Sequence, residues 1–181
     1  MNWLKKIFPS GVDTQNSSMP PASGGWETVN TLIVTKKSLW VGDLFIADRD
    51  DGRMIEVPNG DYKIDTKRAQ TKYGDQIIRI RISPSLKTGF KIGSHIGAIS
   101  IDRATMGICD MNALDIAVGG RNDDFQDHIE ELHLDDFGEI KFKLASDLEI
   151  IYLKTGKGDG TYPVFALTDA DKTIGLEIEI T

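Results

Sequence analysis

The chain has 181 residues, 40% of them hydrophobic, and a formal net charge of −7 with a pI near 4.9. This length suffices for one sizeable core, and the acidic balance argues against nucleic acid as a partner, because that affinity comes from Lys and Arg. No apolar run is long enough to span a membrane, and the N-terminal apolar stretch is too short for a secretory signal, so we expect a cytoplasmic protein. The single cysteine, Cys109, excludes an internal disulfide.

Residues 1–25 are expected to form an N-terminal segment and linker. An amphipathic turn suited to docking or packing is indicated at its start, where the apolar residues are Trp3, Leu4, Ile7 and Phe8. The rest of the segment is rich in Pro, Ser and Gly, so it cannot bury enough apolar surface to offset the entropy of ordering it.

Residues 26–181 are expected to form a single β-rich domain. Short runs of β-forming residues recur between turn residues, which predicts strands over 28–34, 39–46, 53–57, 62–65, 76–82, 97–102, 105–109, 139–144, 149–153, 162–167 and 173–180. Hairpin turns are expected at Asp51-Gly52, at Asn59-Gly60 and over 168–172. In the last strand, isoleucines and a leucine alternate with Glu177 and Glu179, which predicts one buried face and one face in water.

One amphipathic helix is predicted over residues 123–132, because Phe125, Ile129 and Leu132 fall on one helical face. A shorter helical turn is expected over 111–118. Together these elements predict a mainly β, α+β fold: an antiparallel β-sandwich or a strongly bent sheet with one or two short helices.

The most distinctive motif is Gly158-Asp159-Gly160-Thr161-Tyr162-Pro163-Val164. Turn chemistry explains its residues: glycine permits unusual backbone angles, Asp159 can cap a turn, and Tyr162 enters an edge strand. In a functional interpretation, Asp159 is instead an exposed carboxylate on a rigid loop, available to a metal or another ligand.

This motif, together with Val41-Gly42-Asp43, the VPNGDY segment 57–62 and the AISIDRATMGICD segment 98–110, resembles the bacterial domain of unknown function 4241 family. The resemblance runs from about residue 38 to the C-terminus. It implies a β-rich domain without an established activity. Some similar small domains sit beside bacterial toxins as immunity proteins, so the resemblance also implies that context.

A catalytic alternative uses carboxylates. A small hydrolase could combine Asp159 with Asp43, Asp102 or Asp110, around a divalent cation or without one. Cys109, with His95 nearby in sequence, invites a nucleophilic interpretation, but nothing beside it would make a thiolate, so a buried strand cysteine is favoured. The histidines and Cys109 form no zinc motif, and the sequence indicates neither a catalytic residue nor a cofactor.

The negative charge of the chain is concentrated in residues 121–136, which contain seven acidic residues and one arginine. The acids are Asp123, Asp124, Asp127, Glu130, Glu131, Asp135 and Asp136. One interpretation is a solvated helix face. The other is a negative patch that steers and docks a basic protein.

We therefore expect a non-catalytic acidic binding protein, in particular an immunity protein that neutralises a cognate bacterial toxin by direct binding. The alternatives are the carboxylate- or metal-dependent hydrolase and a scaffold module that docks through residues 3–8. The sequence indicates a protein partner, no nucleic acid and no membrane span, and it does not indicate an oligomeric state.

Overall fold

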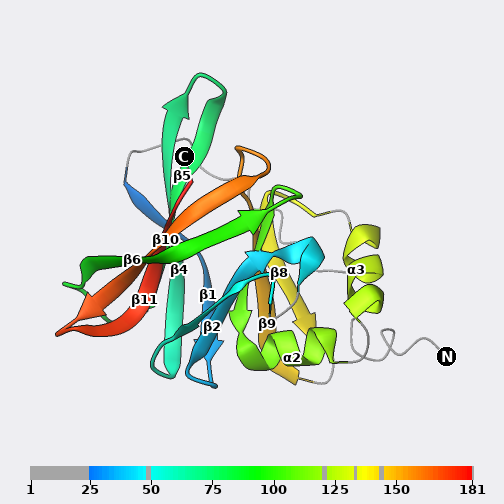
Figure 1. Ribbon diagram of the computed structural model, residues 1–181, viewed down its shortest axis with the longest axis horizontal. Helices are drawn as coiled ribbons and strands as arrows, with labels where there is room; N and C mark the ends of the chain where they lie inside the picture. The colour runs from blue at the N-terminus through cyan, green and yellow to red at the C-terminus, as the bar shows by residue number, and fades with distance from the viewer. Residues whose placement is uncertain (1–24, 48–49, 120–121, 133, 143–144, 181) are drawn as a thin grey trace.

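The structure is a computed structural model that describes residues 25–47, 50–119, 122–132, 134–142 and 145–180. Within them, two antiparallel sheets pack face to face (Figure 1). The six-stranded sheet has the order β1 (Trp26–Val34), β4 (Gly60–Thr71), β5 (Gly74–Pro84), β11 (Lys172–Glu179), β10 (Gly160–Asp169) and β6 (Lys91–Ile101). The five-stranded sheet has the order β3 (Arg53–Glu56), β2 (Ser38–Asp43), β7 (Thr105–Asp110), β9 (Ala145–Lys154) and β8 (Phe137–Phe142). The expected mainly β fold is confirmed.

The helices add a third layer. Helices α2 (Met111–Val118) and α3 (Asn122–Glu131) lie beside the five-stranded sheet, away from the six-stranded one (Figure 1). Apolar side chains between the sheets form one core, and a second core lies between the five-stranded sheet and the helices, where Phe125 and Ile129 are fully buried. Strand β9 serves both cores, because Ile151 faces one and Ile150 the other. Among the described residues, no helix has both the length and the apolar character needed to cross a membrane.

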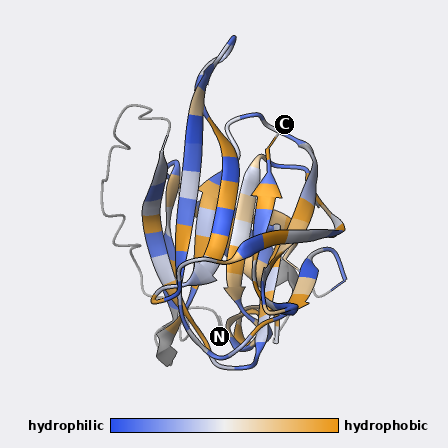
Figure 2. Cartoon of the chain, turned by 90° about the vertical axis from the view of Figure 1, so that its left-hand side faces the viewer, coloured by the Kyte–Doolittle hydropathy of each residue, from blue (hydrophilic) through white to orange (hydrophobic). Residues whose placement is uncertain are grey.

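Within the described residues the predicted strands are all present; of the strand expected over 139–144, residues 143–144 lie outside them. Figure 2 shows the expected alternation of hydrophilic and hydrophobic bands along the strands. The predicted helix and helical turn are confirmed as α3 and α2. The strand expected over 39–46 is too long, because Asp43 caps a 3₁₀ helix, η1 (Leu44–Ile46), through a hydrogen bond to the amide of Phe45.

Of the three turn predictions, one was wrong, one is confirmed in part and one is confirmed. Asn59-Gly60 is a crossing from β3 in one sheet to β4 in the other. Asp51-Gly52 does lie in the turn that leads from β2 into its antiparallel partner β3, but neither residue is among the described residues with positive φ. The final hairpin does close where predicted, with Ala170 and Asp171 both at positive φ, as its two-residue turn requires.

The two halves of the chain are related by an approximate two-fold axis. The six-stranded sheet reads β1-β4-β5 from one edge and β6-β10-β11 from the other, so the halves meet where β5 pairs with β11. The registers agree as well: Val34 lies opposite Gly60 in one half and Ile101 opposite Gly160 in the other. In the five-stranded sheet β2 pairs with β7 at the centre, flanked by β3 and β9 in equivalent registers.

Equivalent backbone details recur at two crossings between the sheets, the first from β1 to β2 and the second from β6 to β7. Lys37 and Ala104 adopt φ of 54° and 55°, and their carbonyls accept hydrogen bonds from Val57 and Thr155 at 3.0 and 2.8 Å. Each crossing therefore has the same turn, built twice from different residues.

Two buried aspartates hold these crossings reciprocally. Asp43, at the end of β2, accepts hydrogen bonds from the amides of Asp102 and Arg103 in the second crossing. Asp110, at the end of β7, accepts hydrogen bonds from the amides of Thr35 and Lys36 in the first. Each half thus supplies an aspartate that binds the backbone of the crossing in the other half.

The two halves differ most in the connection that follows the central strand of each half, β2 in the first and β7 in the second. The N-terminal half connects β2 to β3 with residues 44–52. The C-terminal half uses a longer segment, from the end of β7 to the residues of β9 that pair with β7. That segment contains α2, α3 and β8. The acidic stretch lies entirely within this addition.

Candidate functional site

The acidic residues predicted as a docking surface lie on α3 and on the segment between α3 and β8. Asp127, Glu130, Glu131, Asp135 and Asp136 are all exposed. Asp123 and Asp124 lie in the first turn of the helix, and their side chains are outside the described part of the structure. Because Phe125 and Ile129 are buried in the helix-facing core, the acidic side of α3 points outward.

Two of these acids have cations beside them. Glu130 forms an ion pair with Arg103, whose guanidinium also lies 5.2 Å from the ring centroid of Phe45. Asp136 lies 4.0 Å from the ammonium of Lys154. With the residues that the structure describes, Asp127, Glu131 and Asp135 form no ion pair, so the surface keeps a negative excess.

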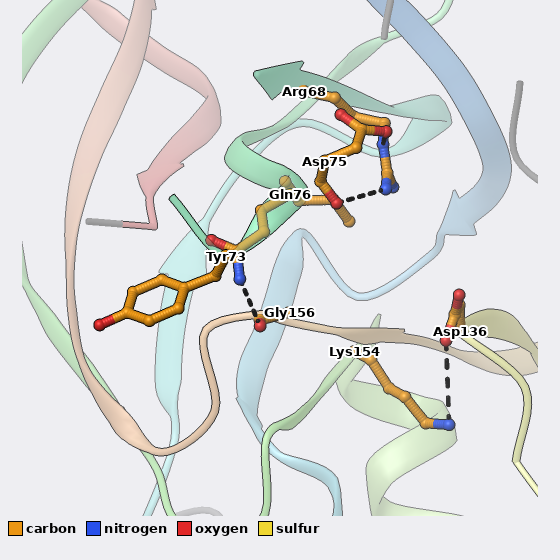
Figure 3. Close-up of a pocket in the computed structure, with 8 residues that line it drawn as sticks. Arg68, Tyr73, Asp75, Gln76, Asp136, Lys154 and Gly156 are labelled. Carbon is orange, nitrogen blue, oxygen red and sulfur yellow. Dashed lines mark hydrogen bonds and ion pairs between the residues drawn. The ribbon is translucent and has the colours of Figure 1, made fainter. Parts of the chain in front are cut away.

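A crevice of about 190 Å³ opens beside this surface (Figure 3). One wall is the β4–β5 hairpin and the other is formed by Asp136 and the turn between β9 and β10; the lining residues are Arg68, Tyr73, Asp75, Gln76, Ile77, Asp136, Lys154 and Gly156. Gln76 joins the walls by donating a hydrogen bond to the carbonyl of Gly156 at 2.9 Å. Of these residues the sequence analysis had singled out only Asp136.

The Gly158 to Tyr162 motif forms a strand entry. The buried Tyr162 hydroxyl donates to the carbonyl of Gly158 at 2.7 Å, and Gly158 has a φ of 97° that favours glycine. Tyr62 does the same in the other half, where its hydroxyl donates to the carbonyl of Pro58 at 2.8 Å. A tyrosine that closes the β3–β4 crossing in one half and the β9–β10 crossing in the other in this way has a structural role.

The carboxylates of the hydrolase hypothesis are not all brought together: the backbone amide of Asp102 donates a hydrogen bond to Asp43, whereas Asp110 lies apart from Asp43. Asp43 lies opposite Met106 in the β2–β7 register and Asp110 lies opposite Leu39, so the two are four residues apart along the strands, about 13 Å. Both accept several backbone hydrogen bonds. Asp159 is exposed on its turn. Among the described residues, no group of three or more His, Cys, Asp or Glu side chains is placed to hold a metal ion.

The structure describes the residues of the cysteine interpretation but not those of the scaffold interpretation. Cys109 is fully buried, and burial raises the pKa of its thiol far above the ordinary value, which suits a packing role. His95 is exposed on β6, with its ring centroid 5.5 Å from that of Phe165. The docking segment Trp3 to Phe8 lies outside the described residues.

An acidic pair at the edge of the five-stranded sheet makes stability depend on pH. Burial, together with repulsion from Glu139 and a hydrogen bond with it, raises the pKa of Glu149 to about 7, although Lys141 opposes the rise. The folded chain therefore holds a proton that the unfolded chain releases near the ordinary pKa of 4.5. Stability from this group is present below that value and is lost as the pH rises towards 7.

We predict that Glu149→Gln matches the original chain near pH 4.5 and is more stable by about 1–2 kcal/mol near pH 8, since half-burial screens part of the shift. Denaturant unfolding at several pH values measures this difference. The exposed Glu56→Gln is the matched control and should show a constant difference. If the curves of Glu149→Gln and the original chain ran parallel, the raised pKa would be contradicted.

Searches with this chain against protein-family models, curated proteins and solved structures return no match.

Proposed function

We propose that this protein is a non-catalytic acidic binding protein that docks a basic protein partner, as an immunity protein does when it neutralises a bacterial toxin by direct binding. The observation that carries the proposal is the placement of the acids. They lie on a segment added to one half of a fold whose other parts occur twice. The N-terminal half forms its strands in both sheets without such a segment. The exposed acids of the added segment are therefore not required to build the sheets.

The contrast with the buried aspartates supports this interpretation. Asp43 and Asp110 are each 2% exposed and hold backbone amides, whereas the acids around α3 face solvent. Clustered surface charge raises the rate at which an oppositely charged partner is captured. A partner with a basic binding face, such as a nuclease toxin with its nucleic-acid site, has the complementary charge.

We predict that reversing Asp127, Glu131 and Asp135 to Lys lowers the association rate of the partner at least about tenfold at low salt, and much less at high salt where the field is screened. These three acids form no ion pair with the described Lys or Arg residues, and the one described histidine that they affect is His128, whose pKa burial lowers and Glu131 raises. The partner to test first is the product of the neighbouring reading frame, and surface plasmon resonance at several salt concentrations measures the rate.

The matched control reverses three exposed acids elsewhere, Asp51, Glu56 and Asp61, which changes the net charge equally. Equal slowing in both triple variants would show that only net charge matters. A toxin-rescue growth assay decides the biological role: protection of cells by the original chain and its loss in the first variant supports an immunity protein.

A further inference from the structure

Strand β3 is an outer strand of the five-stranded sheet, and with the described residues it pairs only with β2. Just after β3, the amide of Val57 donates a hydrogen bond to the carbonyl of Lys37 at 3.0 Å. In an antiparallel pair, the residues whose backbone groups point towards the neighbouring strand alternate with residues whose groups point away. The N–H and C=O groups of Met54 and Glu56 therefore point towards the free edge of β3.

The equivalent edge in the second half is covered by β8. Val57 corresponds to Thr155, whose amide donates in the same way to the carbonyl of Ala104. One residue earlier, the amide of Lys154 points the other way and donates to the carbonyl of Asp136 at 2.7 Å, just before β8 begins. Strand β8 then continues as the antiparallel partner of β9. The second half thus shows what binds an edge of this kind.

Side chains of β3 are exposed at positions that are buried in β9. Met54 corresponds to Tyr152, and the exposed fraction is 56% for the first and 0% for the second. Arg53 is also exposed, whereas its equivalent, Ile151, is fully buried. The free edge therefore carries an adaptable apolar side chain and a cation beside its outward backbone groups.

The cation at this edge is held in position by the other sheet. The Nε of Arg53 donates to the carbonyl of Ala98 in β6 at 3.2 Å, and the guanidinium lies against Gly97 so closely that a Cβ atom has no room there. In the second half, the residue of β8 opposite Ile151 is Glu139. An acid at the equivalent position beside β3 would lie opposite Arg53, where a cross-strand pair of opposite charges is stabilising.

We propose that the free edge of β3 binds an extended segment of a partner protein, which adds as an antiparallel strand in the position that β8 has beside β9. In β8, Phe137 packs against the core between the sheets, and Glu139 follows on the same face. The equivalent residues of the added strand lie opposite Ile55 and Arg53. The segment therefore presents a large apolar residue and, two residues later, an acid. Backbone hydrogen bonds supply affinity, and these two side chains supply specificity.

This edge is separate from the acidic surface around α3. Strands β3 and β8 are the outer strands on opposite sides of the five-stranded sheet, four strand spacings or roughly 19 Å apart. The acidic segment leads directly into β8. At the β3 edge, Glu56 contributes its backbone groups and not its carboxylate. Strand addition there therefore does not depend on the proposed function.

The test adds the peptide acetyl-Ser-Phe-Gly-Glu-Ile-Lys-Phe-amide to the full chain and follows amide NMR shifts. The peptide is segment 136–142 with Asp136→Ser, which removes an acid that would lie opposite Glu56. We expect saturable shifts at residues 53–57, with a dissociation constant on the order of millimolar. Replacing the glycine of the peptide by N-methylglycine should abolish binding, because the N–H of that residue donates to β3. Replacing its glutamate by glutamine should weaken binding about two- to fivefold.

A variant of the protein tests the same edge. Met54→Pro removes an N–H that points away from β2, so the hydrogen bonds between β2 and β3 stay in place and peptide binding should be lost. Met54→Leu keeps this N–H and should bind the peptide as the original chain does. Absence of saturation, shifts at residues 148–153 in place of 53–57, or equal binding by the N-methylglycine peptide or by folded Met54→Pro would overturn the proposal. The two peptides decide the question even where Met54→Pro does not fold.

Discussion

Asp110→Asn should destabilise the fold by about 3–5 kcal/mol, because it places an amide group where a buried carboxylate accepts from several donors. The two oxygens of Asp110 accept from the amides of Thr35 and Lys36, from the hydroxyl of Thr35 and from the amide of Asn112. An asparagine supplies only one acceptor oxygen, and its NH₂ group opposes an N–H donor. Thermal unfolding measures the loss, expected as a fall in Tm of roughly 10 °C.

The symmetry supplies a second variant and a control. Asp43→Asn should cost a similar amount, because Asp43 holds the other crossing through the same kind of hydrogen bonds. Asp159→Asn, at an exposed turn, should change stability by less than about 0.5 kcal/mol. A small cost for both buried aspartates would mean that the crossings hold without them.

Much of the fold was predictable because its signals are local. Alternating side chains located the strands, and the spacing of Phe125 and Ile129 gave the correct helix face. The pairing of strands was not predictable, because it depends on contacts between distant residues. Asn59-Gly60 illustrates this: its turn chemistry is the same whether the chain returns in one sheet or crosses to another.

The internal two-fold relation was also missed, for a clear reason. Between equivalent positions of the two crossings the shared identity is little more than the aspartate itself, Asp43 and Asp110, on a background of apolar alternation. Similarly, Gly60 and Tyr62 recur as Gly160 and Tyr162 with few identical neighbours. The segments that suggested a family resemblance are these repeated pieces, so their order in the chain reflects how the sheets are closed.

The acidic surface of the candidate site could be predicted from the sequence, and the crevice beside it could not. A run of acids is visible in any sequence, so the docking surface could be proposed from composition alone. The crevice could not, because Tyr73 and Asp136 come to line it only when the β4–β5 hairpin lies against the β9–β10 turn. An isolated tyrosine in a polar hairpin carries no signal of its own.

The alternation in the last strand predicted that Glu177 faces water, and this was wrong. Glu177 does point away from the core, yet it is only 2% exposed. It lies opposite Arg81 where β5 meets β11, at the two-fold axis, and it binds both Arg79 and Arg81 at 3.1 and 2.7 Å. The guanidinium of Arg81 in turn lies 3.7 Å from the centroid of the Trp26 ring.

We therefore predict that Glu177→Gln destabilises the protein by about 2–3 kcal/mol, since it leaves two adjacent guanidinium groups without their shared carboxylate. Glu179→Gln is the matched control: it is the same substitution two residues along the strand, at a side chain that is 32% exposed and, among the described residues, forms an ion pair with Arg79 only. That change should cost less than about 1 kcal/mol. Denaturant unfolding compares the two, and equal costs would show that the buried carboxylate does not join the halves. A larger cost at Glu177 would show that its ion pairs across β5 and β11 stabilise the contact between the two halves, in addition to the hydrogen bonds that Asp43 and Asp110 accept at the two crossings.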